Sequence, residues 1–211
     1  MRFPQSTRPR SRASPPDGMP MTTYFTADLH LGQPEILSLR QRPWASIEEH
    51  DAALLAAINA TVGPDDTLYI LGDVTACEDD TRVKAWLSAI ACPDRRLVLG
   101  NHDKAHALFE PGAFTEICAY RELVVDGHPC CLSHYPMLDW NRGDAYYRTH
   151  ELVRAAIMLH GHIHSRGAAT NRANARDGVW RYDVGVDAND YAPVSLPAIW
   201  EVICTHDPRP L

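Results

Sequence analysis

Five short motifs rich in metal-binding side chains are spread along this chain, and most of them directly follow an apolar, β-prone run. The motifs are Asp28-Leu29-His30, Gly72-Asp73, Gly100-Asn101-His102-Asp103, Ser133-His134 and His160-Gly161-His162-Ile163-His164. The preceding runs include 22–26, 68–71, 97–99 and 157–159. Because the carboxyl ends of parallel strands meet at one edge of a sheet, we expect the motifs to converge there.

The first half of the chain alternates between strand-like and helix-like segments. The predicted strands are 22–27, 67–71 and 96–99, and the predicted helices are 52–60 and 80–90. Ser46-Ile47-Glu48-Glu49 matches a capping box before the first helix. Alternation of this kind indicates β-α-β units with a largely parallel sheet.

The second half is richer in strands. The runs 117–125 and 129–132 flank Asp126-Gly127, which is a hairpin turn signal. We predict a helix over about 146–154, a strand at 157–160, and strands at 180–186 and 198–204 that close a second sheet. Pro193 and Pro197 are best placed in a loop or at an edge. The whole pattern fits an α/β sandwich of two mixed sheets covered by helices.

Length and composition fit one globular domain. Among the 211 residues, 1–20 combine arginines and prolines without an apolar segment, which predicts a disordered N-terminal tail or an over-extended start, with the domain at 21–211. No run approaches the roughly 18 apolar residues of a membrane span. The six cysteines form no C-x-x-C pair, so reduced thiols and a cytoplasmic location are expected.

The net charge of −7 is unevenly distributed. Residues 21–141 hold 18 acidic against 8 basic side chains, whereas 142–181 hold 7 arginines against 3 acidic side chains. An acidic body disfavours non-specific binding of duplex nucleic acid, because basic side chains supply most of that affinity. The Arg-rich stretch either faces a small phosphorylated substrate or consists of solvated loop arginines.

Each motif has a structural alternative when it is taken alone. Asp73 reads equally as a turn or cap residue, His134 as an ordinary core or surface histidine, and Asp103 as the cap of a turn or helix. The dense histidine cluster is harder to explain structurally. If it stays extended, His162 and His164 lie on one side and can serve adjacent ions.

In this order, the motifs resemble the calcineurin-like metallophosphoesterase superfamily from about Thr22 to Cys204. The resemblance implies a four-layer α/β/β/α sandwich and two divalent ions. It assigns Asp28, His30 and His164 to the first ion, Asp73 to a bridge between the ions, and Asn101, His134 and His162 to the second ion. His102 would bind no metal and would face the leaving group as proton donor. The nucleophile would be a hydroxide that bridges the two ions.

Mixed nitrogen and oxygen ligands favour manganese, with iron, zinc or nickel as alternatives, over calcium or magnesium.

Departures from the family pattern indicate which branch of the superfamily the chain resembles. Protein Ser/Thr phosphatases of the superfamily continue the second motif as G-D-x-x-D-R-G, whereas this chain reads Gly72-Asp73-Val74-Thr75-Ala76-Cys77 and lacks that arginine. The context, including Val184-Gly185-Val186-Asp187, resembles a small bacterial and phage phosphoesterase branch, which often has a histidine where this chain has Gln33.

The leading interpretation is a metal-dependent phosphodiesterase acting on small or nucleotide-like substrates, with Arg42 and Arg142 as candidate phosphate contacts. A phosphomonoesterase and a nuclease are the enzymatic alternatives, and nucleic acid is the less favoured substrate. A non-catalytic binding or scaffold protein is the remote alternative, since every expected ligand is intact. No membrane partner is expected, and the oligomeric state is left open.

Overall fold

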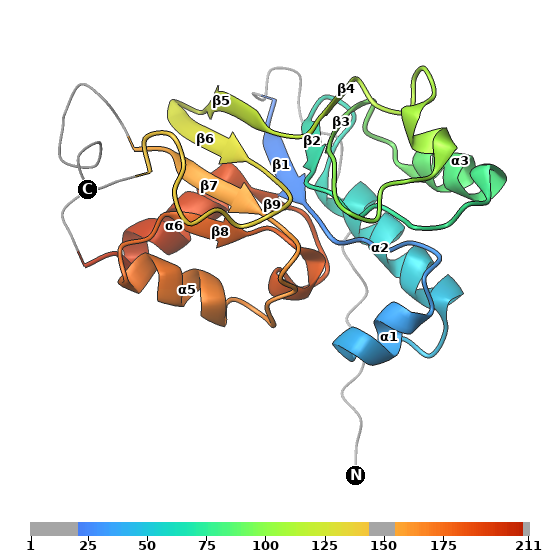
Figure 1. Ribbon diagram of the computed structural model, residues 1–211, viewed down its shortest axis with the longest axis horizontal. Helices are drawn as coiled ribbons and strands as arrows, with labels where there is room; N and C mark the ends of the chain where they lie inside the picture. Colours follow the sequence, from blue (N-terminus) through green and yellow to red (C-terminus); the bar gives the residue numbers. More distant parts are fainter. Residues whose placement is uncertain (1–20, 144–154, 209–211) are drawn as a thin grey trace, which may run out of the picture.

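Two mixed β-sheets form the centre of the molecule, and helices flank them (Figure 1). The computed structural model describes residues 21–143 and 155–208, so the predicted helix at 146–154 lies outside the described residues. Among the described helices, none is long and apolar enough to cross a membrane. The predicted arrangement of two mixed sheets between helices is confirmed.

The first sheet has five strands in the order β4-β3-β2-β1-β9. Their bounds are Glu116–Cys118 (β4), Asp94–Val98 (β3), Thr67–Ile70 (β2), Thr23–Thr26 (β1) and Val194–Ser195 (β9). The first four are parallel, and β9 runs antiparallel to β1. The polar motifs after β1, β2 and β3 therefore lie at the same edge of the sheet, as predicted.

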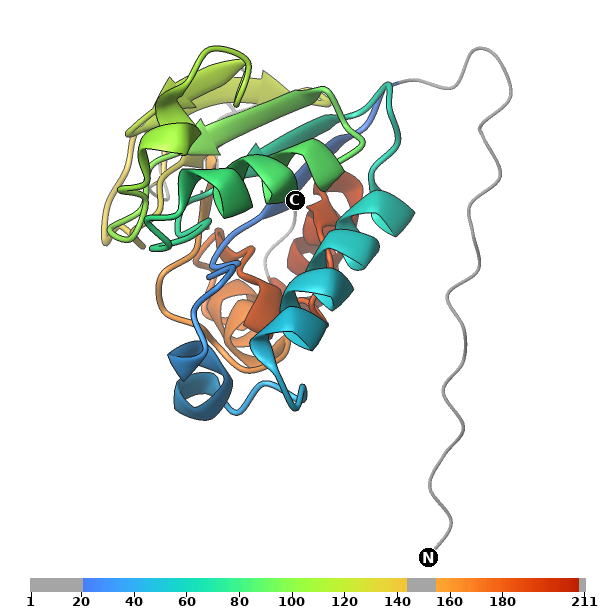
Figure 2. The same ribbon diagram turned by 90° about the vertical axis from the view of Figure 1, so that its right-hand side faces the viewer.

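Two long helices cover the outer face of this sheet. They are α2 (Ile47–Thr61) and α3 (Asp80–Ala89), and Figure 2 shows them (cyan and green) across the strands. Their buried side chains share one core with those of β2 and β3. The Ser46 hydroxyl accepts a hydrogen bond from the Glu49 amide at 3.2 Å, so the predicted N-cap is confirmed and the helix begins five residues earlier than expected. The short α1 (Glu35–Arg40) and the 3-10 turn η1 (His106–Phe109) complete this side.

The second sheet has four strands in the order β5-β6-β7-β8. Their bounds are Arg121–Val125 (β5), His128–Leu132 (β6), Ile157–His160 (β7) and Arg181–Asp183 (β8). β5 and β6 form the predicted antiparallel hairpin, in which Asp126 and Gly127 both have positive φ. The other pairs are parallel, so the motifs after β6 and β7 also share one edge.

Several predictions for the second half are wrong in detail. The segment 198–204 is part of a helix, α6 (Leu196–His206), with Pro197 in its first turn. Its buried side chains are Leu196, Ile199 and Ile203, a helical spacing that β-branched composition obscures. The run 117–125 splits between the two sheets, and the predicted strand 180–186 ends at Asp183 before the 3-10 turn η2 (Val186–Ala188). The helix α5 (Ala169–Arg176) was not expected.

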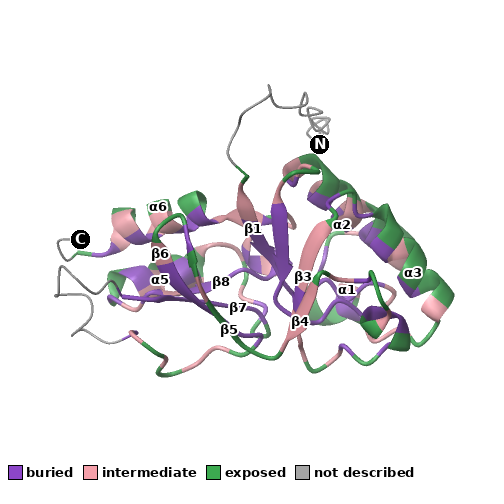
Figure 3. Ribbon diagram, turned by 90° about the horizontal axis from the view of Figure 1, so that it is seen from above, coloured by how far each residue is buried: buried purple, intermediate pink, exposed green. Residues whose placement is uncertain are grey.

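The space between the sheets is filled by apolar side chains. Phe25 and Leu71 from the first sheet share a core cluster with Leu132 and Leu159 from the second, and α6 contributes Ile199. The strands β1, β2, β6 and β7 are accordingly almost wholly buried, whereas the outward faces of α2 and α3 are exposed (purple and green in Figure 3). This core fixes the two sheets against each other and brings their polar edges together.

Candidate metal centre

The loops that follow five strands meet at one point and are joined by backbone hydrogen bonds. The Asp28 amide donates to the Gly72 carbonyl at 3.0 Å, which ties the loop after β1 to the loop after β2. The Gly161 amide donates to the His134 carbonyl at 3.0 Å, which ties the loop after β7 to the loop after β6. The Asp28 carboxylate accepts from the His162 amide at 2.9 Å and so connects the two sheets.

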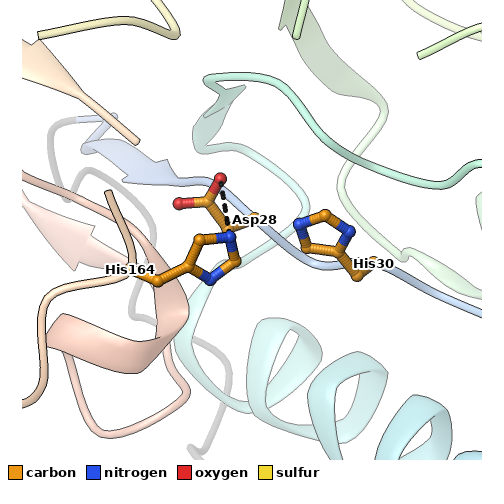
Figure 4. A group of neighbouring side chains, drawn as sticks. All are labelled: Asp28, His30 and His164. Carbon is orange, nitrogen blue, oxygen red and sulfur yellow. Dashed lines mark ion pairs between the residues drawn. The ribbon is translucent and has the colours of Figure 1, made fainter. Parts of the chain in front are cut away.

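All seven predicted ligands lie together. Asp28, His30 and His164 form one group whose ligand atoms lie within 4.8 Å of one another, and Figure 4 shows the three side chains. The Nε2 atoms of His30 and His134 lie 3.5 and 3.3 Å from an Asp73 oxygen. Asn101 and His162 contact His134, through Asn101 Oδ1 at 3.1 Å from Nε2 and through ring centroids 5.0 Å apart.

The backbone at these positions is unusual. Five of the seven residues have positive φ, a region that residues other than glycine rarely enter. The angles are 60° (Asp28), 51° (His30), 57° (Asp73), 73° (His162) and 48° (His164). Left-handed residues of this kind cluster at active sites and ligand clamps, where the surrounding structure enforces them. The turns aim consecutive side chains at one point, which a regular strand does not do.

Three imidazoles are oriented for ligation by the same device. Nδ1 lies 2.7 Å from Gln33 Oε1 in His30, 2.9 Å from the Leu71 carbonyl in His134, and 2.8 Å from an Asp187 oxygen in His164. Because these partners accept hydrogen bonds, Nδ1 carries the proton in the neutral form of each ring, and Nε2 then has a lone pair. Gln33, three residues after His30 in the sequence, thus supplies the acceptor for His30.

The three lone pairs face other acceptors. His30 Nε2 is buried without a hydrogen-bond partner, and His164 Nε2 lies 4.0 Å from an Asp28 oxygen. His134 Nε2 faces the oxygens of Asn101 and Asp73. Acceptors that face one another are stabilised by a cation between them. Metal-ligating histidines in proteins almost always donate their other ring N–H in this way.

Two buried carboxylates add negative charge. Burial raises the pKa of Asp28 to about 7. Burial also opposes the ionisation of Asp73, but hydrogen bonds from His134, when its ring carries a second proton on Nε2, and from the His102 amide outweigh burial and lower the pKa of Asp73 to about 2. In the described part of the chain, neither carboxylate pairs with a lysine or arginine. Buried carboxylates without such partners commonly coordinate metal ions.

Comparison with known proteins identifies the family. Residues 21–186 match the calcineurin-like phosphoesterase superfamily domain. The chain belongs to the calcineurin-like phosphoesterase superfamily. It is therefore a metal-dependent phosphoesterase, as the motifs predict, and its buried aspartate and histidine cluster is the expected place for divalent metal.

Relatives of this phosphoesterase occur in phages and archaea. It is 31% identical over 186 residues to the gene 66 protein of Mycobacterium phage L5, covering 79% of this chain and 86% of the phage protein. An uncharacterized protein of Methanocaldococcus jannaschii is 25% identical, with 85% and 90% covered. A solved structure from Aquifex aeolicus, of unknown function, has a TM-score of 0.65 and 26% identity, and covers 87% of this chain and 100% of its own.

The other predicted site residues, His102, Arg142 and Arg42, differ in how they lie relative to the candidate ligands. The His102 ring lies beside His30 with centroids 5.1 Å apart, at the opening of the site. The His102 ring also lies near enough to His30 and Asp73 to form a group of three potential ligands with them. Its position is therefore compatible with either role, metal ligand or proton donor. Arg142 is half-buried. Hydrogen bonds from Asn141 and Tyr120, and to a smaller extent the charge of Arg142, lower the pKa of Glu122 on β5, and no described contact brings Arg142 to the ligands.

Arg42 does not lie where a substrate contact would be. Its side chain is buried, and its guanidinium donates to Asp187 and to the backbone carbonyls of Asp28 and Leu29. A cation whose donors are used inside the protein does not reach a substrate phosphate. The expectation from residue type is therefore corrected: this arginine lies behind the candidate metal ligands.

Two aspartates that support the site were not predicted in their present role. The Asp103 carboxylate accepts from the amides of Asp73, Val74 and Gly100 at 2.9, 2.7 and 2.8 Å, so it joins two motif loops rather than capping a helix. Asp187 accepts from His164, as described above. Asp103 lies within the third motif, and Asp187 lies in the segment 184–187, which resembles a small bacterial and phage phosphoesterase branch. The sequence around them does not predict which groups they contact.

Proposed function

We propose that this phosphoesterase binds two divalent ions, with manganese as the first choice, and hydrolyses small phosphodiesters. The carrying observation is the set of three imidazoles whose Nε2 lone pairs face carboxylate and amide oxygens. Asp28, His30 and His164 would hold the first ion, and Asp73 would bridge. Asn101, His134 and His162 would hold the second. Bound there, two dications would supply a hydroxide nucleophile and neutralise phosphate charge.

Two side chains of the second position open toward solvent, and the third, His134, is buried. Asn101 and His162 are exposed, whereas Asp28, His30 and His164 are buried. We therefore propose that substrate approaches from the side of His162. His102 is half-buried at this opening and is placed to donate a proton to the departing alkoxide, a role that typically contributes about 10²–10⁴-fold.

Two features favour a diester over a monoester. A phosphomonoester carries more charge, and Arg42, which was predicted to contact the phosphate, is turned inward. The opening is flanked instead by Tyr135 and Ile163, which are 47% and 40% exposed, and the Tyr135 ring lies 4.8 Å from that of His162. An apolar rim of this kind suits the second ester group of a small diester, such as an aromatic or nucleotide-like one.

The test is hydrolysis of two nitrophenyl esters by the manganese-loaded protein. We expect faster turnover of bis-p-nitrophenyl phosphate than of p-nitrophenyl phosphate, and the reverse ratio would indicate a phosphomonoesterase. Cleavage of single-stranded or duplex nucleic acid in preference to both would indicate a nuclease, which the acidic body of the chain disfavours. A protein that binds both ions and turns over none of these substrates would support a non-catalytic role.

The role of His102 has its own test. His102→Ala should lower kcat by about 10²–10⁴-fold while the metal content stays at the wild-type value. Loss of metal together with activity would show that His102 is a ligand.

We also propose a cytoplasmic location, because all six cysteines are free and reduced thiols are typical of that compartment.

A further inference from the structure

A buried ion pair lies directly behind the proposed ligands of the first ion. Arg42 Nε and Nη2 donate to the two oxygens of Asp187 at 3.0 and 2.8 Å, although 145 residues separate the two in sequence. Both side chains are at most 5% exposed. Paired donation of this kind fixes the orientation of the carboxylate as well as its position.

Each partner of the pair holds a different part of the site. Asp187 Oδ2 accepts from Nδ1 of His164 at 2.8 Å, which turns Nε2 toward Asp28. Arg42 Nη2 donates to the Asp28 carbonyl at 2.7 Å, and Nη1 donates to the Leu29 carbonyl at 3.0 Å. The loop after β1 and the histidine loop after β7 are therefore joined through one guanidinium and one carboxylate.

Hydrogen bonds on the side away from the candidate ligands hold Arg42 of the pair in place. Arg42 Nη1 lies 2.8 Å from His50 Nε2, and His50 Nδ1 lies 2.9 Å from Asp51. The Asp51 carboxylate accepts from the Gly32 amide at 3.0 Å, in the turn that follows the first motif. Since Arg42 donates to His50 Nε2, the proton of the His50 hydrogen bond lies on Nδ1 and is donated to Asp51, which also accepts from the Gly32 amide.

We infer that the Asp187–Arg42 pair is the positioning device of the first ion: it holds the His164 imidazole and the left-handed loop of Asp28 in the geometry that binds metal. The inference rests on the proposed two-ion function. Asp28 and His164 both have positive φ, so their loops need outside contacts to stay in place. In the described part of the site, the second-ion residues Asn101, His134 and His162 hydrogen-bond neither partner of the pair, and their link to it is indirect, through the His162 amide that donates to Asp28. The direct contacts of the pair are therefore with the first-ion residues.

The experiment compares the metal content of wild type, Asp187→Asn and Arg42→Lys. Asp187→Asn keeps an oxygen that can accept from His164 but removes the charge that holds Arg42. Arg42→Lys keeps the charge, but a single ammonium cannot serve the carboxylate and two carbonyls together. Each protein is loaded with Mn²⁺ and titrated with a chelator, and bound metal is measured by mass spectrometry. Electron paramagnetic resonance distinguishes exchange-coupled ion pairs from isolated ions.

We expect both variants to bind one of the two ions about 10–100-fold more weakly, as is typical when a group that orients a ligand is altered. At intermediate chelator the content should fall from two ions to one per chain, and the coupled signal should give way to that of an isolated ion. Asp94→Asn is the matched control. It alters another Arg–Asp pair, Arg96–Asp94, at the opposite end of β3, and it should keep both ions.

The outcomes separate this inference from the proposed function. Wild type that binds fewer than two ions would overturn the two-ion function itself. Two ions of unchanged affinity in both variants would overturn the positioning role alone. Equal weakening of both ions would also overturn it, because the pair would then support the whole fold. Circular dichroism of the metal-free proteins verifies folding; if Asp187→Asn does not fold, Arg42→Lys, which leaves no unpaired charge, decides the question.

Discussion

The backbone of Gly72 passes so close to the metal site that its lack of a side chain is a requirement. Its φ is 88°, and an added Cβ would lie 2.5 Å from Nδ1 of His134 and 2.7 Å from Cα of Gly100. Neither neighbour has room to move. The His134 ring is fully buried and donates to the Leu71 carbonyl, and the other contact is backbone.

The expected cost of Gly72→Ala has two parts. A left-handed backbone costs a residue with Cβ about 1–2 kcal/mol. Forcing an extra carbon into a packed region costs typically about 1–3 kcal/mol. Gly112 provides a control that contains only the first part, because its φ is 87° and nothing lies within 4 Å of the position of an added Cβ. We therefore expect Gly72→Ala to lose about 1–3 kcal/mol more than Gly112→Ala.

Thermal unfolding of the metal-free proteins, followed by circular dichroism, measures the difference. For a chain of this length about 1 kcal/mol corresponds to a Tm change of about 2–4 °C, so the two variants should differ by about 2–12 °C. Gly72→Ala should also bind less metal, since His134 must shift, whereas Gly112→Ala should bind as wild type does. Equal Tm values for the two variants would refute the argument from close approach.

Three further predictions concern stability. Ser46→Ala removes the acceptor of the Glu49 amide and should cost about 0.5–2 kcal/mol, seen as a lower urea midpoint with an unchanged m-value. The hydrogen bonds of Asp94, with Arg96 first, lower its pKa to about 2, so its contribution is present above pH of about 4 and is lost as pH falls through 2; Asp94→Asn should lower Tm at pH 7 and match wild type near pH 2. Excess chelator should lower the Tm of the loaded protein, and Mn²⁺ should restore it; an unchanged Tm would contradict metal binding by the folded state.

The first sheet was predictable because polar motifs stand at the ends of apolar runs. β1, β2 and β3 are short and buried, and each ends where its motif begins, so both the strand and its parallel direction follow from the pattern. The segment 198–204 was misread because isoleucine and valine favour strands, whereas burial at Leu196, Ile199 and Ile203 has helical spacing. There the tertiary contacts of α6 with the core between the sheets override local preference.

The clustering of the candidate metal ligands was predictable from chemistry, and the residues behind them were not. Histidine and aspartate at strand ends carry metal chemistry in their side chains, so His134 and Asp73 are candidates before any fold is known. Arg42 was a candidate phosphate contact because of its charge, but it is buried in an ion pair with Asp187. An arginine is rarely buried unless such a partner neutralises its charge. That partner is 145 residues away, and no local pattern reveals it.

The buried polar residues behind the site restrain the loops that carry the candidate ligands in left-handed conformations. Five ligand residues in the left-handed region would each relax toward an ordinary conformation if nothing held them. Asp103 restrains the loop of Asp73 by accepting from its amide, and Arg42 restrains the loop of Asp28 by donating to its carbonyl. Because these contacts use backbone amides and carbonyls rather than the candidate ligand atoms, the fold itself supplies the restraint. Metal affinity should therefore depend on residues that never touch the metal.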